Sequence, residues 1–182
     1  MKKNAGFTIV EMILYMGLLT IMMMILTRMF TGIVDVQLES QASSAVEEDG
    51  RYIFSRLAYD IGRASNIITP ASLGSQTSVL TLTIGGVSYT YAVSENNLTL
   101  TNDQGSDVLN GQGTSISNFA VTRLGNTGGK HALRVQLTIT STTEGVAGVE
   151  SKTVETTMAL RSKKITDRRS WFFLRLWSLL SS

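Results

Sequence analysis

The residue with the clearest chemical demand is Glu11, which lies four residues after a Gly6–Phe7 junction and directly before the apolar run 12–34. A carboxylate near the centre of a membrane helix costs about 3 kcal/mol and less near its end, so a partner charge is expected. If the chain were cut between Gly6 and Phe7, the new α-amino group of Phe7 would match the Glu11 carboxylate of a neighbouring copy. The alternative is that Glu11 lies at the level of the lipid headgroups.

The other residue types exclude several kinds of chemistry. The chain contains no cysteine, which excludes disulfides, thiolate metal sites and a cysteine nucleophile. The single histidine, His131, follows a glycine-rich turn at 125–130 and lacks partners for a metal site or a catalytic triad, so it is expected to be a solvated loop residue. No phosphate-binding glycine loop and no Ser/His/Asp arrangement is present. We therefore expect no catalytic, cofactor or metal site, and no enzymatic activity.

Charge and hydropathy at the N-terminus predict a membrane-inserted helix. Lys2 and Lys3 precede an apolar stretch, an order that is typical of a Sec-type segment whose amino end stays in the cytoplasm. At about 1.5 Å per residue, the stretch 7–30 is long enough to cross a bilayer. Residues 30–35 contain no signal-peptidase site. The net charge of +2 comes from basic residues at the two chain ends, so nucleic acid is not an expected partner.

These N-terminal residues resemble a known processing signal. Lys2-Lys3 and Gly6, followed by Phe7-Thr8, Glu11 and an apolar helix, are similar to the class III signal of type IV prepilins and type II secretion pseudopilins. The resemblance implies that a prepilin peptidase cuts between Gly6 and Phe7 and N-methylates Phe7, and that Glu11 guides packing into a filament. It implies four partners: the peptidase, other pilins or pseudopilins, an inner-membrane assembly platform and membrane lipid.

A second, looser resemblance lies further along the chain. Segments 47–52 and 57–64 are similar to the equivalent helix of the PilW minor pilins and the J-type pseudopilins, which favours a minor subunit. Two features depart from many major pilins: Arg28 lies where they have a proline, and their C-terminal cysteine pair is missing. The alternative interpretation is that the charged residues of this helix form solvated i,i+3 pairs worth a few tenths of a kcal/mol, with these members: Glu48, Arg51, Asp60 and Arg63.

Helical periodicity continues beyond the membrane segment. Between residues 35 and 65 there is no proline, and apolar residues recur at helical spacing, as at Ala42, Ile53 and Leu57. One helix from about Phe7 to Ser65 would be roughly 90 Å long. Gly50 is its expected weak point and could allow a bend, because glycine costs about 1 kcal/mol relative to alanine in a helix.

After Pro70 the apolar period changes from 3.6 to 2, which predicts strands. Residues 80–84 and 87–93 flank a Gly85-Gly86 turn and predict a hairpin, and a second hairpin is expected around 125–129. Residues 102–115 are expected to form a loop. The predicted fold class is α+β, with a long N-terminal helix packed on an antiparallel β-sheet head. Five parts are expected: leader 1–6, transmembrane or filament-core helix 7–34, outer helix 35–66, head 67–162 and tail 163–182.

The basic and apolar tail 163–182 suits an interfacial membrane segment or a partner-docking helix, and equally a segment that folds back on the sheet or an appendage. The expected function is that of a structural subunit of a type IV pilus or type II secretion pseudopilus. It would insert in the inner membrane with its head outside the cytoplasm and then enter the filament. The alternatives are a filament-displayed adhesin or DNA-binding minor pilin, or an uncleaved single-pass anchored domain.

Overall fold

One long helix dominates the computed structural model, which describes residues 8–127, 129–145 and 147–160. Helix α1 runs without a break over Ile9–Arg63. Thr8 caps its start by accepting the backbone N–H of Glu11, and the backbone N–H of Ala64 closes its end on Ile61 O. The sequence contains no proline before Pro70, and the helix continues through Gly50, its expected weak point.

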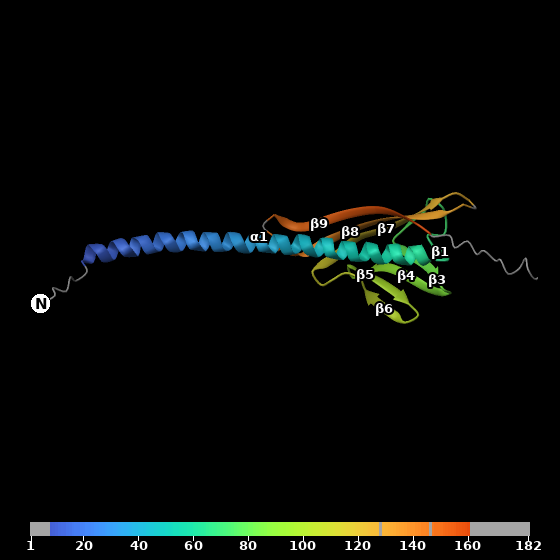
Figure 1. Ribbon diagram of the computed structural model, residues 1–182, viewed down its shortest axis with the longest axis horizontal. Coiled ribbons are helices and arrows are strands. Elements are labelled where there is room, and N and C mark those ends of the chain that lie inside the picture. Colours follow the sequence, from blue (N-terminus) through green and yellow to red (C-terminus); the bar gives the residue numbers. More distant parts are fainter. Residues whose placement is uncertain (1–7, 128, 146, 161–182) are drawn as a thin grey trace, which may run out of the picture.

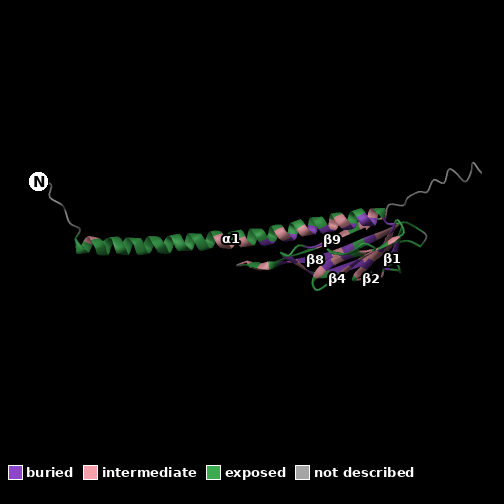
Figure 2. Cartoon of the chain, turned by 90° about the horizontal axis from the view of Figure 1, so that it is seen from below, coloured by how far each residue is buried: buried purple, intermediate pink, exposed green. Residues whose placement is uncertain are grey.

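The two halves of α1 have different surroundings. In Figure 1 the first half stands clear of every strand, and the second half lies against the strands of the head. Figure 2 colours nearly all of the protruding half as exposed, and the buried positions of α1 lie along the part that is packed on the sheets. The periodicity predicted the burial of Ala42, Ile53 and Leu57. The buried positions of α1 recur every three or four residues and also include Gly50 and Asp60, which the apolar pattern did not contain. The full set is Ala42, Val46, Gly50, Ile53, Leu57, Asp60 and Ile61.

Within the described residues nine strands form the head, and their pairings are antiparallel. They are β1 (Asn66–Thr69), β2 (Gln76–Thr77), β3 (Val79–Ile84), β4 (Val87–Ser94), β5 (Asn97–Asn102), β6 (Gly105–Val108), β7 (Thr114–Gly125), β8 (His131–Gly145) and β9 (Gly148–Ala159). Both predicted hairpins, β3–β4 and β7–β8, are present. The α+β prediction of a long helix packed on antiparallel β-structure is confirmed.

The strands divide between two sheets, where a single sheet was expected. One sheet has the order β1-β3-β4-β5-β6 and the other β2-β7-β8-β9. Buried Asn110 joins them: its side chain accepts the Leu98 N–H of β5 at 2.9 Å and donates to Thr114 O of β7 at 3.0 Å. The apolar faces of both sheets and the inner face of α1 enclose one core, which includes Leu57, Tyr91 and Leu137.

Two local differences from the sequence-based expectations have clear physical reasons. Strand β6 lies inside the expected loop 102–115; all four of its residues are exposed, so no apolar alternation marks it. His131 is not a solvated loop residue but begins β8, paired with Gly125, and is half-buried. Gly125 has a φ of +142°, and a Cβ atom there would lie 2.7 Å from Lys130 O and 3.0 Å from His131 Nδ1, which explains why glycine precedes the turn.

Gly50 is a close-packing position, and this gives a first prediction. A Cβ atom at Gly50 would lie 3.3 Å from Ile139 Cδ1, whereas a Cβ atom at Gly62 would meet nothing within 4 Å. We expect Gly62→Ala to raise the free energy of unfolding by up to about 1 kcal/mol through helix propensity. Gly50→Ala should gain less, and Gly50→Leu should lose about 2 kcal/mol through overpacking. Urea unfolding of the detergent-solubilised chain measures all three, and a Gly50→Leu variant as stable as wild type would contradict the close packing.

Candidate functional site: an exposed apolar helix and its attachment to the head

The protruding half of α1 presents an unusual concentration of apolar side chains to solvent. Every large hydrophobic side chain from Ile9 to Ile33 is at least half exposed. By length and composition, this is the one helix of the described residues that could cross a membrane. Exposure of this extent is not a property of a soluble monomer, since contiguous apolar patches on soluble monomers rarely exceed a few hundred Å². The exposed apolar half of α1 is therefore compatible with a membrane-spanning helix.

The polar side chains of this half are arranged to suit an apolar environment. Thr20 Oγ1 donates to Met16 O at 2.8 Å, and Thr27 Oγ1 donates to Met23 O at 2.9 Å. Hydroxyl groups that donate to a carbonyl one turn earlier leave no unsatisfied donor to face lipid. The apolar character of the surface is thus maintained through the threonines.

Glu11 lies in the first turn of α1, where the sequence placed it. Its backbone N–H donates to Thr8 Oγ1 at 3.3 Å, and the Tyr15 hydroxyl donates to Glu11 Oε1 at 3.4 Å. The first turn of a helix favours a carboxylate, because the unpaired N–H groups there carry partial positive charge. These contacts orient the carboxylate beside the helix start and provide no cation. Gly6 and Phe7, the expected cleavage and methylation positions, lie outside the described residues.

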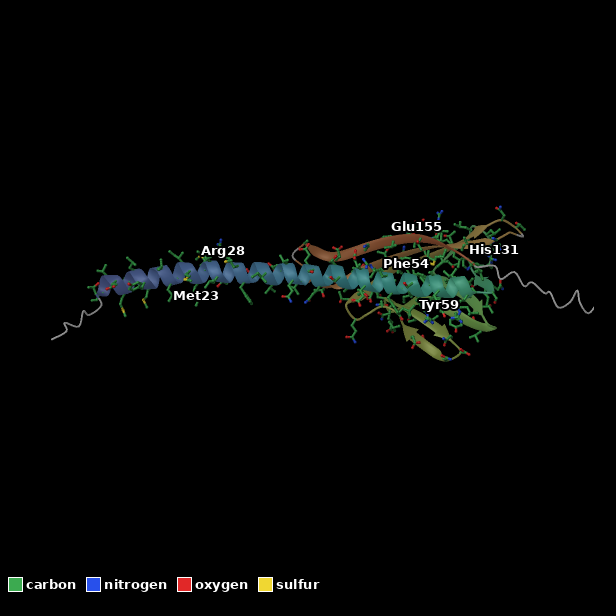
Figure 3. The ribbon with its side chains drawn as sticks, in the orientation of Figure 1. Met23, Arg28, Phe54, Tyr59, His131 and Glu155 are labelled. Atoms are coloured by element: carbon green, nitrogen blue, oxygen red, sulfur yellow. The ribbon has the colours of Figure 1, made fainter. Side chains whose placement is uncertain are left out.

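The second charge on this half is Arg28. Figure 3 shows Arg28 on the protruding half of α1, well away from the head, with Met23 on the other side of the helix. Its backbone carbonyl accepts the Thr31 hydroxyl at 3.0 Å. No side chain of the described residues forms an ion pair with the Arg28 guanidinium. The four ion pairs of the described residues all lie between residues 47 and 155.

A buried carboxylate, Asp60, fixes the outer half of α1 to the first sheet. Asp60 is 1% exposed; Arg56 Nε donates to its Oδ2 at 2.9 Å, and the Tyr91 hydroxyl of β4 donates to the same oxygen. Burial, together with the hydrogen bond to Asp60, raises the pKa of the Tyr91 phenol, so this hydroxyl remains a donor. The expectation that Asp60 is a solvated i,i+3 partner is wrong, because it lies on the buried face with Ile53 and Leu57.

Arg51 and Arg63, which were also expected to form i,i+3 pairs, have other partners in the structure. Arg51 pairs with Glu47 one turn earlier at 3.2 Å, and Arg63 lies over the Tyr59 ring at 4.7 Å. Lys152 of β9 also reaches Glu47, with 2.9 Å between Nζ and Oε1. The hydrogen bond and charge of Lys152, with the charge of Arg51, lower the pKa of the Glu47 carboxyl. This exposed cluster connects α1 to the second sheet.

A third attachment uses Asp49, which sequence reasoning missed. Its carboxylate accepts the Gly111 N–H at 2.8 Å and the Thr114 hydroxyl, so it holds the segment between β6 and β7 against α1. The signal for Asp60 was present in the sequence, since it falls on the helical face of Ile53, Leu57 and Ile61. Asp49 carried no comparable signal, because its partners are 62 and 65 residues away in a segment without periodicity.

The described residues contain no cluster of three or more His, Cys, Asp or Glu side chains that could hold a metal ion. The expected tail 163–182 lies beyond the part of the chain that the structure describes, which ends at Leu160, where the backbone N–H donates to His131 O.

The site is therefore an apolar, exposed helix with one carboxylate at its start, attached to the head at three points. Comparisons with protein-family models, curated proteins and solved structures found no match.

Proposed function

We propose that this chain is a prepilin, a structural subunit of a type IV pilus or a type II secretion pseudopilus, of the minor type and without enzymatic activity. The observation that carries the proposal is the combination in α1 of an entirely exposed apolar half, a carboxylate in its first turn, and an unbroken continuation into the head. A signal peptide or a simple anchor needs neither the carboxylate nor the continuous helix. A subunit that leaves the membrane to pack helix against helix needs both.

The proposed sequence of events begins in the inner membrane. The basic residues Lys2 and Lys3 keep the N-terminus in the cytoplasm, and the apolar half of α1 spans the bilayer with the head outside. Prepilin peptidase cuts between Gly6 and Phe7 and N-methylates Phe7. The assembly platform then moves the subunit out of the lipid, and the apolar half of α1 packs against the corresponding helices of other pilins or pseudopilins.

Charge pairing gives Glu11 its role in this proposal. Cleavage leaves an α-amino group on Phe7, and the Glu11 carboxylate of an adjacent subunit is the anion that compensates it. In an apolar surrounding this pair is favoured strongly over two separate charges, since each unpaired charge would retain its desolvation cost. The three attachments of α1 to the head support the same role, because force applied to the helix must carry the head with it.

The proposal predicts that Glu11→Gln separates processing from assembly. Processing should be unchanged, because the cut lies four residues earlier, whereas incorporation into sheared filaments should fall roughly a hundredfold through loss of a pair worth about 3 kcal/mol. Immunoblotting of sheared and membrane fractions, from cells that express the cognate peptidase and assembly platform, measures both. Glu48→Gln is the matched control, since Glu48 is an exposed carboxylate on the outer half of α1. Equal incorporation of Glu11→Gln and wild type would contradict the proposal.

A further inference from the structure

The second sheet ends in a long strand with one unpaired edge. Strand β9 is the last in the order β2-β7-β8-β9, and its register with β8 is regular from Ala159 back to Ser151. The backbone N–H of Leu160 donates to His131 O. Because backbone groups alternate in direction along a strand, this bond shows that the even-numbered residues of β9 face β8. The odd-numbered residues 151–159 direct their backbone groups away from β8, where no strand of the described residues pairs with them.

An open edge of this length is unusual. Unpaired N–H and C=O groups on an edge strand are a template for another strand, and proteins usually shorten, bend or cover such an edge. Strand β9 has twelve residues, and its pairing shows no bulge over 151–159. The odd-numbered side chains of this stretch are all exposed. The edge is therefore suited to the addition of one more strand.

An incompletely buried apolar seam runs along the same edge. Phe54 of α1 and Met158 of β9 pack against the core but are only half-buried, and Val154 is half-buried as well. Figure 3 shows Phe54 and Glu155 at the same level of the head, and the ion pair of Lys152 with α1 holds the two elements together. A strand added beyond β9 would place every second side chain over this seam and complete its burial.

We infer that residues 171–180 of this chain pair with the open edge of β9 as an antiparallel strand. Residues 161–182 follow directly from Leu160 at the end of β9 and lie outside the described residues. Fully extended, 171–180 span about 33 Å, which matches the length of about 30 Å of the edge 151–159. Residues 161–170 are long enough to reverse the chain, since hairpin loops commonly need only about two to five residues. The inference concerns the head and its own tail and does not depend on the proposed function.

The tail fits this position in pattern and in charge. The even-numbered residues of 171–180 are apolar except Ser178, as in a strand face that covers a core. The charged side chains of 161–182 are basic apart from Asp167, whereas Glu150 and Glu155 are exposed acidic side chains of β9. Opposite charges on neighbouring strands stabilise their pairing. The apolar residues that would cover the seam are Phe172, Leu174, Leu176 and Leu180.

The covalent link makes the tail the favoured occupant of the edge. A segment joined to its site by a short linker acts at an effective concentration of about the millimolar range, which exceeds the usual concentration of a separate partner. Pairing also removes half of the apolar side chains of 171–180 from their surroundings. The tail thus closes the edge of β9 against pairing with the edges of other chains.

Hydrogen exchange at the level of single amides tests the pairing, because alternate amides of β9 provide an internal control. In the full chain, held in phosphatidylcholine nanodiscs, the amides of Thr153 and Thr157 should exchange roughly tenfold or more slowly than in a chain that ends at Ser162. The amides of Val154 and Thr156 bond to β8 and should stay protected in both chains. Equal exchange of the Thr153 and Thr157 amides in the two chains would overturn the inference.

A point variant makes the same test without truncation. In the full chain, Leu174→Asp/Leu176→Asp should release the Thr153 amide as truncation does, whereas Ser181→Asp/Ser182→Asp, beyond the proposed strand, should not. This comparison decides the matter if the truncated chain also loses protection at its even-numbered amides and so fails to fold. Protection of the Thr153 amide that rises with protein concentration would show that a second copy occupies the edge, and this too would overturn the inference.

Fluorescence locates the tail directly, because both tryptophans of the chain, Trp171 and Trp177, lie in the proposed strand. A nitroxide label on Glu155→Cys should quench their emission. The same label on Thr101→Cys, at an exposed position of β5 in the other sheet, should not. Brominated phosphatidylcholine in the nanodisc should leave the emission unchanged. Quenching by the brominated lipid, with none from the label at position 155, would place the tail on the membrane and overturn the inference.

Discussion

Asp60→Ala should lower the free energy of unfolding by about 3 kcal/mol, the largest stability effect that we expect from any single exchange. The Asp60 carboxylate is buried between α1 and β4, and its Oδ2 accepts hydrogen bonds from Arg56 and Tyr91. Its removal leaves the fully buried Tyr91 hydroxyl without an acceptor and opens a small cavity. Arg56 is partly exposed and can return to water, so the loss arises mainly at Tyr91.

Two companion variants separate the hydrogen bond from the buried volume. Tyr91→Phe removes the hydroxyl, keeps the ring in the core, and leaves Asp60 with Arg56, so a smaller loss of about 1 kcal/mol is expected. Asp107→Ala, at an exposed position of β6, should change the free energy of unfolding by less than about 0.5 kcal/mol. Urea unfolding of the detergent-solubilised full chain, followed by circular dichroism, measures all three. An Asp60→Ala variant as stable as Asp107→Ala would show that the carboxylate does not fasten the helix to the sheet.

The expected instability matters for the proposed role of the chain. If α1 transmits the pull of an assembly machine to the head, the attachments at Asp49, Glu47 and Asp60 must hold while the apolar half leaves the membrane. They are distributed along the outer half of the helix and reach both sheets. Asp60→Ala, which weakens the buried attachment, should therefore reduce the yield of intact subunit in filaments, in addition to its effect on unfolding.

Periodicity in the sequence was sufficient for much of this fold. The helical spacing of Ala42, Val46, Ile53 and Leu57 predicted a face that is buried in the structure. Alternation around the Gly85-Gly86 turn predicted the β3–β4 hairpin, in which both glycines have positive φ, as a two-residue turn of this kind requires. In each case the pattern is local, and the structure that it specifies depends on contacts within a few residues or on a single face.

The features that sequence reasoning missed depend on distant contacts. Division of the strands into two sheets follows from the way in which β2 and β7 pair apart from β3, with Asn110 as the bridge, and no local pattern contains that information. Strand β6 has no buried face to reveal it. Asp60 was interpreted from its charge, although its place on the apolar face of the helix would have indicated burial.

The candidate site shows the same division. Glu11 was identified from its type and position, and the structure places it in the first turn of α1, at the start of the exposed apolar half. Arg28 was noted in the sequence because it lies where many major pilins have a proline, and the structure adds that no side chain of the described residues forms an ion pair with it. Gly6 and Phe7 rest on the resemblance of the N-terminal motif.

Gly6→Ala is expected to abolish maturation, the largest functional effect of any exchange in this account. The resemblance implies that the peptidase cuts between Gly6 and Phe7, so a side chain at position 6 should leave the leader 1–6 in place. An uncleaved chain has no α-amino group at Phe7 to pair with Glu11 and should stay in the membrane fraction. Gly17→Ala is the matched glycine control, since a Cβ atom at Gly17 would meet nothing within 4 Å.

The mature N-terminus is the most direct test of the central claim that this chain is a prepilin. It can be determined by mass spectrometry of membranes that contain the protein and its cognate peptidase, with processing of another prepilin in the same cells as the activity control. We predict a peptide that begins at N-methylated Phe7 for wild type and for Gly17→Ala, and an unprocessed N-terminus for Gly6→Ala. A wild-type chain that still begins at Met1 or Lys2, despite an active peptidase, would contradict the claim and indicate a single-pass anchored domain.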